Sequence, residues 1–549
     1  MNSILTITDK INESVGNYPS KLALSIVGGK QFTYNDLKQN ILKLSEKLYR
    51  LGIKKGDKVA ILSENSPFWG ISYLSILNCG ATVVPILNDF SKNEIDNIIN
   101  HSEAKIIFVS KSLKTKIIDI QSSQLKYIID IETGLIENTS SEIIEINETN
   151  KIVEDSIVEP DDIAAIIYTS GTTGSSKGVM LSHKNIVSNI YSTFGIQKII
   201  PSDRLLSILP LSHTYECTLG FLMPLFYGAS VYYIQGPPIP SILLPALKTV
   251  KPTMMLTVPL IIEKIYKNKV LPSLQSGIKK HLYRFCFTRK LLNIIAGKKL
   301  YKTFGGKLHF FGIGGALLDE QTEKFLREAK FPYAIGYGLT ETSPLLAGSN
   351  PKLSRFRSTG FCIPGQELKL IDINDETRHG EIVAKGNNIM KGYYKNEELT
   401  KKSFTSDGWF RTGDLGFIDN DNYLFIKGRI KNLILGANGE NIYPEEIESI
   451  INKHKLVVES IVYEIKGKIV ARVHLDYAEI EKRYNSFIES SKVLQNDIND
   501  YIKKTLDEIK TFVNTQVNSF SKLAIVIEQP VPFEKTPTQK IKKFLYTKI

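Results

Sequence analysis

Residues 163–181 read IAAIIYTSGTTGSSKGVML and place a loop rich in glycine and hydroxyl groups between two apolar runs. The first run is typical of a buried strand. Gly171, Gly174 and Gly178 allow backbone N–H groups to converge on an anion, and four hydroxyl side chains add donors. Lys177 supplies a positive charge, but Gly178 follows it where the Walker pattern requires Ser or Thr. The segment predicts a phosphate-binding loop of another kind, with a plain surface loop as the alternative.

In the chain before this loop, the spacing of apolar residues alternates between that of a helix and that of a strand. Residues 33–52 are amphipathic at helical spacing, with Thr33 as the expected N-cap and Gly52 as the expected end. The apolar runs 58–63 and 104–110 are typical of buried strands. This alternation predicts an α/β fold in which helices cover sheets.

A separate small α/β domain is expected near the C-terminal end. Apolar residues recur at helical spacing from Ile498 to Val517. Residues 522–533, KLAIVIEQPVPF, then predict a strand that runs into a proline-bearing loop.

The composition is typical of a soluble globular protein. Of 549 residues, 42% are hydrophobic and 23% charged, which excludes a disordered or coiled-coil chain. The four cysteines lie far apart in sequence, which fits neither a close-spaced zinc site nor a disulfide-dense scaffold. Asp9 and Glu13 interrupt the N-terminal segment, so no signal peptide is expected and a cytoplasmic location is predicted.

One uncharged stretch, residues 217–234, is just long enough to cross a bilayer. Gly220, Pro224 and Gly228 interrupt it. A helix and a strand buried between layers of an α/β domain explain it better than a membrane span.

Positive charge is concentrated in residues 264–318, which we call the basic window. The chain has 69 Lys and Arg against 57 Asp and Glu, a surplus of 12, and the window alone holds 12 Lys and Arg with no acidic residue. Because the basicity is local, no nucleic acid is expected as a partner.

One or two basic amphipathic helices are predicted in the basic window, suited to anionic lipid at the inner face of a membrane or to a polyanionic ligand. The alternative is a solvated helix face whose apolar side lies in the core. The expected cations are Lys279, Lys280, Arg284, Arg289, Lys290, Lys298 and Lys299, with Phe285 and Phe287 as apolar insertions.

Four further segments follow the phosphate loop in order. They are GIGGALL at 312–318, YGLTETSP at 337–344, GWFRTGDLG at 408–416 and KGRIKNLILGANGENIYPEEIE at 427–448. With residues 168–178 they resemble the adenylate-forming, or AMP-binding, superfamily, and most of all its long-chain fatty acid CoA ligases, the acyl-CoA synthetases. The resemblance implies a large N-terminal multi-layer α/β domain, residues 1–430, and a small mobile C-terminal α/β domain, residues 431–549.

The resemblance also implies how ATP and magnesium are held. Thr340 would meet the α-phosphate and Glu341 would hold Mg²⁺, a hard cation that needs oxygen ligands. Asp414 would accept the ribose hydroxyls, with Arg429 as a second ribose and phosphate contact. Taken singly, such residues are more often parts of turns or of packing. The phosphate loop would comprise Thr169, Ser170, Gly171, Thr172, Thr173, Gly174 and Lys177, and the adenine site Gly314, Gly315, Ala316, Tyr337 and Gly338.

Three positions are assigned by the same resemblance to the acyl group and to domain movement. His213 would border the carboxylate site, with a hydrogen-bonded core histidine as the alternative. Lys540 would bridge the carboxylate and the α-phosphate while the adenylate forms. Lys431 would be the hinge about which the small domain rotates, which brings the loop around Gly439 to the path of coenzyme A.

The predicted function is ATP-dependent activation of a fatty acid to an acyl-adenylate, followed by transfer to coenzyme A. An apolar tunnel is expected from residues 217–247 and 253–262. Two alternatives stay open within enzymes: transfer to an acyl carrier protein, or a reaction that stops at the acyl-adenylate. A non-catalytic lipid- or anion-binding protein on the same fold is the alternative from another class.

Overall fold

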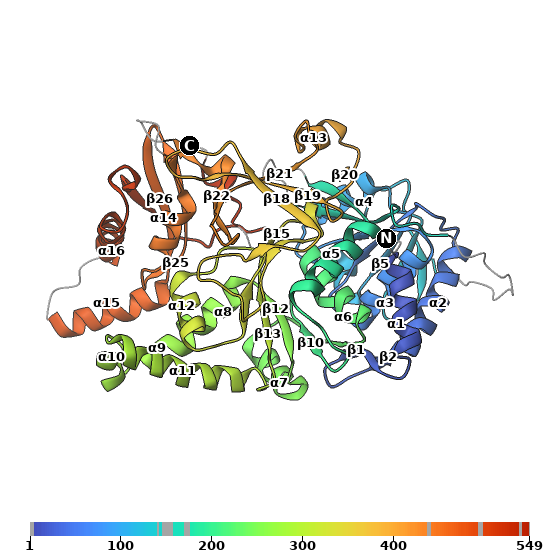
Figure 1. The fold of residues 1–549 in the computed structure, drawn as a ribbon, viewed down its shortest axis with the longest axis horizontal. Helices are drawn as coiled ribbons and strands as arrows, with labels where there is room; N and C mark the ends of the chain where they lie inside the picture. Colours follow the sequence, from blue (N-terminus) through green and yellow to red (C-terminus); the bar gives the residue numbers. More distant parts are fainter. Residues whose placement is uncertain are drawn as a thin grey trace. The chain divides into compact units, whose positions relative to one another are not determined.

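The computed structural model describes residues 5–139, 142–144, 157–169, 176–435, 441–491, 498–536 and 541–547. The chain divides into two compact units (Figure 1). Unit 1 comprises residues 1–369, 383–411 and 418–425, and unit 2 comprises residues 370–382, 412–417 and 426–549.

An eight-stranded sheet in unit 1 carries the phosphate loop. Its order is β20-β9-β8-β4-β3-β5-β6-β7. The neighbours from β8 through β4, β3 and β5 to β6 are parallel, whereas β6 with β7 and β8 with β9 form antiparallel pairs. The predicted strands at 58–63 and 104–110 are confirmed as β3 and β5. The strands are β3 (Lys58–Leu62), β4 (Thr82–Pro85), β5 (Ile106–Val109), β6 (Tyr127–Asp130), β7 (Ile136–Asn138), β8 (Ile163–Thr169), β9 (Lys177–Ser182) and β20 (Gly392–Tyr393).

The helix predicted from residue 33 is α2 (Tyr34–Arg50). Its N-cap Thr33 accepts a hydrogen bond from the Asp36 backbone N–H, and the Asp36 carboxylate accepts one from the Thr33 N–H. This reciprocal pair satisfies two backbone donors at the start of the helix. Gly52 follows the helix in the left-handed region, with φ of 83°. Both ends are therefore where local sequence chemistry predicts them.

A seven-stranded sheet, order β14-β13-β12-β10-β11-β1-β2, forms the second layer of unit 1. All neighbours are parallel except β1 and β2. The strands are β1 (Leu22–Ile26), β2 (Gln31–Thr33), β10 (Arg204–Ser207), β11 (Ser230–Tyr233), β12 (Met254–Thr257), β13 (Phe310–Ile313) and β14 (Tyr333–Ile335). The helices of unit 1 include α1 (Ile7–Asn17), α3 (Pro67–Asn78), α4 (Lys92–Ser102), α5 (His183–Ile196), α7 (Pro240–Val250), α8 (Pro259–Ile265), α11 (Cys286–Thr303) and α12 (Glu320–Glu328).

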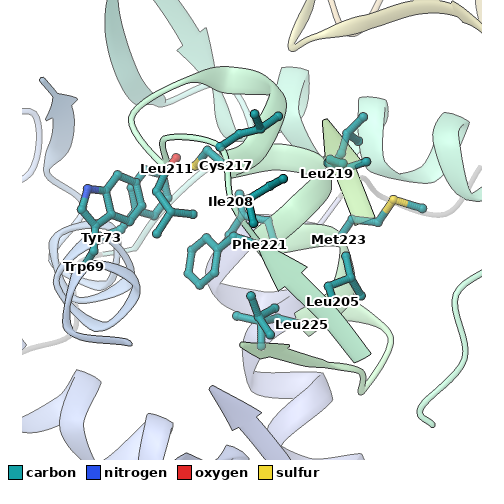
Figure 2. Close-up of a cluster of buried hydrophobic side chains, with 14 of the residues drawn as sticks. Trp69, Tyr73, Leu205, Ile208, Leu211, Cys217, Leu219, Phe221, Met223 and Leu225 are labelled. Atoms are coloured by element: carbon teal, nitrogen blue, oxygen red, sulfur yellow. The ribbon is translucent and has the colours of Figure 1, made fainter. Parts of the chain in front are cut away.

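The uncharged stretch at 217–234 is broken into short elements. A π-helical segment, Glu216–Leu222, leads into α6 (Met223–Phe226) and then into β11, which confirms the predicted helix and strand. Over the part of the chain that the structure describes, no helix is long and apolar enough to cross a membrane. Phe221 meets the rings of Trp69 and Tyr73 edge-on, while Leu219 and Met223 lie away from those rings (Figure 2).

Unit 2 contains the small C-terminal domain. A three-stranded sheet of β25 (Val457–Ile465), β26 (Lys468–Leu475) and β27 (Ile525–Glu528) is accompanied by α14 (Pro444–Ile451), α15 (Tyr477–Ser491) and α16 (Ile498–Asn514). Ile502, Ile509 and Val513 of α16 are buried in its core. The predicted helix, strand and small α/β domain are confirmed.

The chain passes between the two units within the strands around residues 366–429. These strands are β18 (Gln366–Ile371), β19 (Gly380–Gly386), β21 (Phe410–Ile418) and β22 (Leu424–Arg429). Lys431 follows in a short 3₁₀ turn, Ile430–Asn432. The boundary near residue 430 and the rotation about Lys431 stay predictions.

Candidate active site

The phosphate loop is closed at its base by a β-hairpin. Thr169, the last residue of β8, is paired with Lys177, the first residue of β9. Gly178 follows close to Tyr168 and Ile166, where a Cβ atom would stand 2.8 Å from the Ile166 side chain. The hairpin fixes both ends of the loop, whereas the predicted residues Ser170, Gly171, Thr172, Thr173 and Gly174 lie outside the described residues.

Lys177 and Glu341 are brought together through Tyr393. Tyr393 lies on β20, where it pairs with Val179 of β9. The Lys177 Nζ stands 5.4 Å from the centre of the Tyr393 ring, within the range of a cation–π interaction. The Tyr393 hydroxyl donates a hydrogen bond of 2.9 Å to Glu341 Oε1. One buried tyrosine thus links the predicted phosphate lysine to the predicted magnesium ligand.

Tyr393 is not among the site residues predicted from the sequence. The local signal is only the dipeptide Tyr393-Tyr394 after Gly392, and adjacent strand residues point to opposite faces of a sheet. The hydroxyl of Tyr394 donates to Glu103 instead, at 3.3 Å. Which of the two tyrosines faces the site was therefore decided by the register of β20 against β9.

The turn that carries Thr340 and Glu341 is held from two sides. It forms a short 3₁₀ segment, Thr340–Thr342. The side-chain amides of Asn189 and Asn388 each donate to the carbonyl of Thr342, at 3.1 and 3.0 Å, and to the carbonyl of Leu345. The Met390 N–H donates to the Glu341 carbonyl at 2.8 Å. These contacts fix the backbone of the turn, which positions the Glu341 carboxylate.

Glycines allow close backbone approach on both predicted adenine segments. A Cβ atom on Gly338 would lie 1.8 Å from the Pro344 carbonyl oxygen, so this position requires glycine. A Cβ on Gly314 would lie 3.2 Å from the ring of Tyr215, and Gly315 has φ of 91°. Ala316 follows it at the surface, and Tyr337 is partly buried on β15 (Tyr337–Gly338), paired with β16 (Leu345–Gly348).

His213 stands three residues before the π-helical segment. Its Nδ1 accepts a hydrogen bond of 3.1 Å from the Tyr215 N–H, so the neutral ring carries its proton on Nε2. Tyr215 in turn packs beside Gly312 and Gly314. The structure therefore brings the His213 segment beside the glycine segment predicted for adenine.

Tyr215 also lines an apolar cavity of about 50 Å³. Gly336 and Leu345, which stand on either side of the turn bearing Thr340 and Glu341, form part of its wall. Both stretches predicted for an acyl tunnel contribute to its lining. The lining includes Leu205, Leu219, Met223, Met254, Leu256, Phe310 and Ile335.

A buried carboxyl lies in the first turn of the π-helical segment. Burial raises the pKa of Glu216 to about 8. Its Oε2 atom has no hydrogen-bond partner among the described residues, and a Cβ on Gly220 would come within 2.7 Å of its Cδ. Glu216 is not among the predicted site residues, and its position before an apolar run is the only signal of its burial in the sequence.

Asp414 and Arg429, both in unit 2, form an ion pair. The Arg429 Nε donates to Asp414 Oδ1 at 2.7 Å, and the Asp414 carboxylate is buried. The Asp414 N–H donates to the Thr412 hydroxyl at 3.1 Å, while Arg429 Nη1 donates to the Thr412 carbonyl at 3.3 Å. The two predicted ribose contacts are therefore neighbours with fixed geometry.

The remaining predicted positions divide into two groups. Lys540 and Gly439 lie outside the described residues, whereas Lys431 is exposed. Among the residues that the structure does describe, no group of three His, Cys, Asp or Glu side chains could hold a metal ion. Glu341 nevertheless fits Mg²⁺, which proteins commonly bind through one carboxylate together with substrate phosphates.

Comparison with protein families identifies residues 11–394 as an AMP-binding enzyme. The chain belongs to the AMP-binding enzyme family. The predicted superfamily and its α/β fold are confirmed. Membership of this family also confirms the predicted general activity, that of an ATP-dependent ligase that forms an acyl-adenylate.

Relatives with different named substrates resemble the chain to a similar degree. Long chain acyl-CoA synthetase 6, peroxisomal, of Arabidopsis thaliana is 28% identical over 97% of this chain and 81% of its own length. 4-Coumarate–CoA ligase 4 of the same plant is 26% identical over 91% and 83%. The ATP-bound structure of MatB from Rhodopseudomonas palustris is 25% identical, with a TM-score of 0.76 over 98% of this chain and 97% of its own.

Proposed function

We propose that this AMP-binding enzyme activates a fatty acid with MgATP and transfers the acyl group to coenzyme A. The observation that carries the proposal is the position of the apolar cavity. Its wall includes Gly336 and Leu345, the residues that bracket the turn of Thr340 and Glu341, and Lys177 is joined to Glu341 through Tyr393. An apolar cavity that adjoins the turn predicted to meet the phosphates supports an acid with an apolar chain.

The reaction divides into two steps. In the first, a carboxylate oxygen attacks the α-phosphorus of ATP, and pyrophosphate leaves. In the second, the thiol of coenzyme A attacks the acyl carbon, and AMP leaves as a far better leaving group than hydroxide. The acyl-adenylate is therefore the activated species that both steps share.

We assign the phosphates of ATP to one group of side chains. The loop Thr169–Gly174 and Lys177 hold the β- and γ-phosphates, and Thr340 meets the α-phosphate. Glu341 and phosphate oxygens hold Mg²⁺, which neutralises charge on the phosphates when it is bound. Tyr393 is a positioning residue, because its hydroxyl orients the Glu341 carboxylate.

The nucleoside and the acid are assigned to other segments. Gly314, Gly315, Ala316, Tyr337 and Gly338 border adenine, and Asp414 with Arg429 holds the ribose. His213 borders the carboxylate of the acid, and Lys540 bridges that carboxylate and the α-phosphate during the first step.

We assign the change between the two steps to the C-terminal part of the chain. Residues 431–549 rotate about Lys431 against residues 1–430, which withdraws Lys540 and brings the loop at Gly439 to the thiol of coenzyme A. One residue that absorbs a change in backbone angles is sufficient for such a rotation.

ATP–pyrophosphate exchange over carboxylic acids of graded length tests the substrate. Exchange that rises with chain length supports a fatty acid. Exchange with coumarate alone would contradict it and favour the chemistry that is named for 4-coumarate–CoA ligase 4. No exchange with any acid would favour a binding protein without catalytic activity.

The acceptor is tested separately. Incubation with coenzyme A or with a phosphopantetheine-bearing acyl carrier protein, followed by mass analysis of the thioester, distinguishes the two acceptors. A thioester with the carrier protein only, or release of acyl-adenylate with neither acceptor, would replace coenzyme A in the proposal.

A further inference from the structure

Two helices in the basic window expose large apolar side chains. Helix α10 (Ile278–Leu282) and α11 lie at the edge of unit 1 (Figure 1). Phe285 and Phe287, at the start of α11, are 67% and 82% exposed, and Ile278 on α10 is 79% exposed. Leu291 and Ile295 continue the apolar stripe along α11. The expectation that the apolar side of these helices lies in the core is therefore wrong for these five residues.

The opposite side of α11 is the side that packs on the core. Asn293, Gly297 and Leu300 are buried, and a Cβ atom on Gly297 would lie 2.6 Å from Ala329 Cβ. Phe287, Leu291 and Ile295 recur at every fourth position, which places them on one stripe of the helix. Because the buried side of α11 is already in contact with the protein, its exposed stripe is available to another surface.

Exposed cations accompany the stripe along the chain. Lys279, Lys280, Arg284 and Lys290 are exposed and stand within six residues of Phe285 in sequence. Arg289, also predicted to be a surface cation, is instead held by Glu328, with its Nη2 2.9 Å from the carboxylate. The basic window contains no Asp or Glu, so no acidic residue within the window can neutralise the charges of Lys279, Lys280, Arg284 and Lys290.

We propose that the exposed stripe and its cations, from Ile278 to Ile295, dock unit 1 on an anionic lipid bilayer. Exposed aromatic side chains flanked by Lys and Arg match the interface of such a bilayer, where rings insert among acyl chains and cations meet lipid phosphates. A soluble polyanion would use the cations but leave Phe285 and Phe287 in water. A second copy of this surface would bring like charges together, which opposes its association.

Sedimentation with vesicles of phosphatidylglycerol and phosphatidylcholine tests the proposal on the whole chain. We expect binding at low ionic strength and its loss at high salt. Each basic side chain near an anionic surface changes partition by about fivefold, so Lys279→Gln with Lys280→Gln and Arg284→Gln should weaken binding on the order of 100-fold. Phe285→Ser with Phe287→Ser should weaken it while leaving the salt dependence in place.

A matched triple variant controls for net charge. Lys43, Lys111 and Lys126 are exposed residues of unit 1 outside the basic window, and their change to Gln should leave vesicle binding within about twofold. ATP–pyrophosphate exchange without vesicles should be unchanged in all three variants, because none touches the proposed site. If the unmodified protein showed no ATP–pyrophosphate exchange, that result would contradict the proposed function but would leave the docking proposal untouched.

Several results would overturn the docking proposal. One is absence of binding to anionic vesicles at low salt, and another is equal loss in the control variant. A higher Michaelis constant for ATP or coenzyme A in the first variant, with vesicle binding unchanged, would assign the cations to a soluble polyanion. A dimer in analytical ultracentrifugation that the Phe variants dissociate, without vesicle binding, would assign the stripe to a second copy.

Discussion

Changing Tyr393 to Phe removes a single hydroxyl from the candidate site. That hydroxyl donates to Glu341 Oε1 at 2.9 Å, while the ring that faces Lys177 stays in place. A hydrogen bond to a charged group contributes about 1.5–3 kcal/mol. Glu341 is partly exposed, so water can replace part of the lost interaction and the lower figure applies. We expect the rate of adenylate formation to fall about tenfold.

The assay is ATP–pyrophosphate exchange at several magnesium concentrations. An undirected Glu341 carboxylate should raise the magnesium concentration needed for half-maximal exchange, a shift that a general loss of folded protein would not produce. Tyr393→Leu also removes the cation–π contact with Lys177 and should cost about a further threefold.

Tyr394→Phe is the matched control, since its hydroxyl contacts Glu103 and not the site. Exchange rate and magnesium dependence should stay those of the parent protein. If Tyr393→Phe behaves in the same way as Tyr394→Phe while both keep the parent's melting temperature, the positioning role of Tyr393 is refuted.

Three further changes test other parts of the site. Lys540→Ala should slow adenylate formation by about two to three orders of magnitude but spare thioester formation from supplied acyl-adenylate. Rapid-quench assays of each half-reaction measure this, and an equal fall in both would exclude domain alternation. Glu341→Gln should retain nucleotide affinity yet suppress turnover, with partial recovery at high magnesium; unchanged magnesium dependence would remove Glu341 from the metal site. Glu216→Gln should gain stability relative to the parent as pH rises from 4.5 to about 8, because the unfolded Glu216 ionises while the buried one stays protonated. Chemical denaturation across that range measures the difference, and a constant difference would contradict it.

Local chemistry made much of the fold predictable. Thr33 starts α2 because a threonine oxygen and Asp36 three residues later satisfy the first backbone donors, which requires no distant contact. The runs that became β3, β5 and β8 are apolar because parallel or central strands are buried on both faces. The breaks at Gly220 and Pro224 likewise predicted short elements in place of a membrane span.

Burial was less predictable than element type. The helical spacing in the basic window predicted α11, but spacing alone does not say which side of a helix meets the core. Gly297 decides the matter, because its missing side chain lets α11 approach Ala329 closely. The side that carries Phe287 then faces away from the core.

The sequence by itself determined the order of the motifs, the α/β class and the residue types that could hold a nucleotide. Only the tertiary structure decided which of them meet. Tyr393 contacts Glu341 across 52 residues of chain, and it reaches Lys177 because β20 pairs with β9. Contacts of this kind arise from strand register and packing between distant segments, and neither leaves a periodic signal in the local sequence.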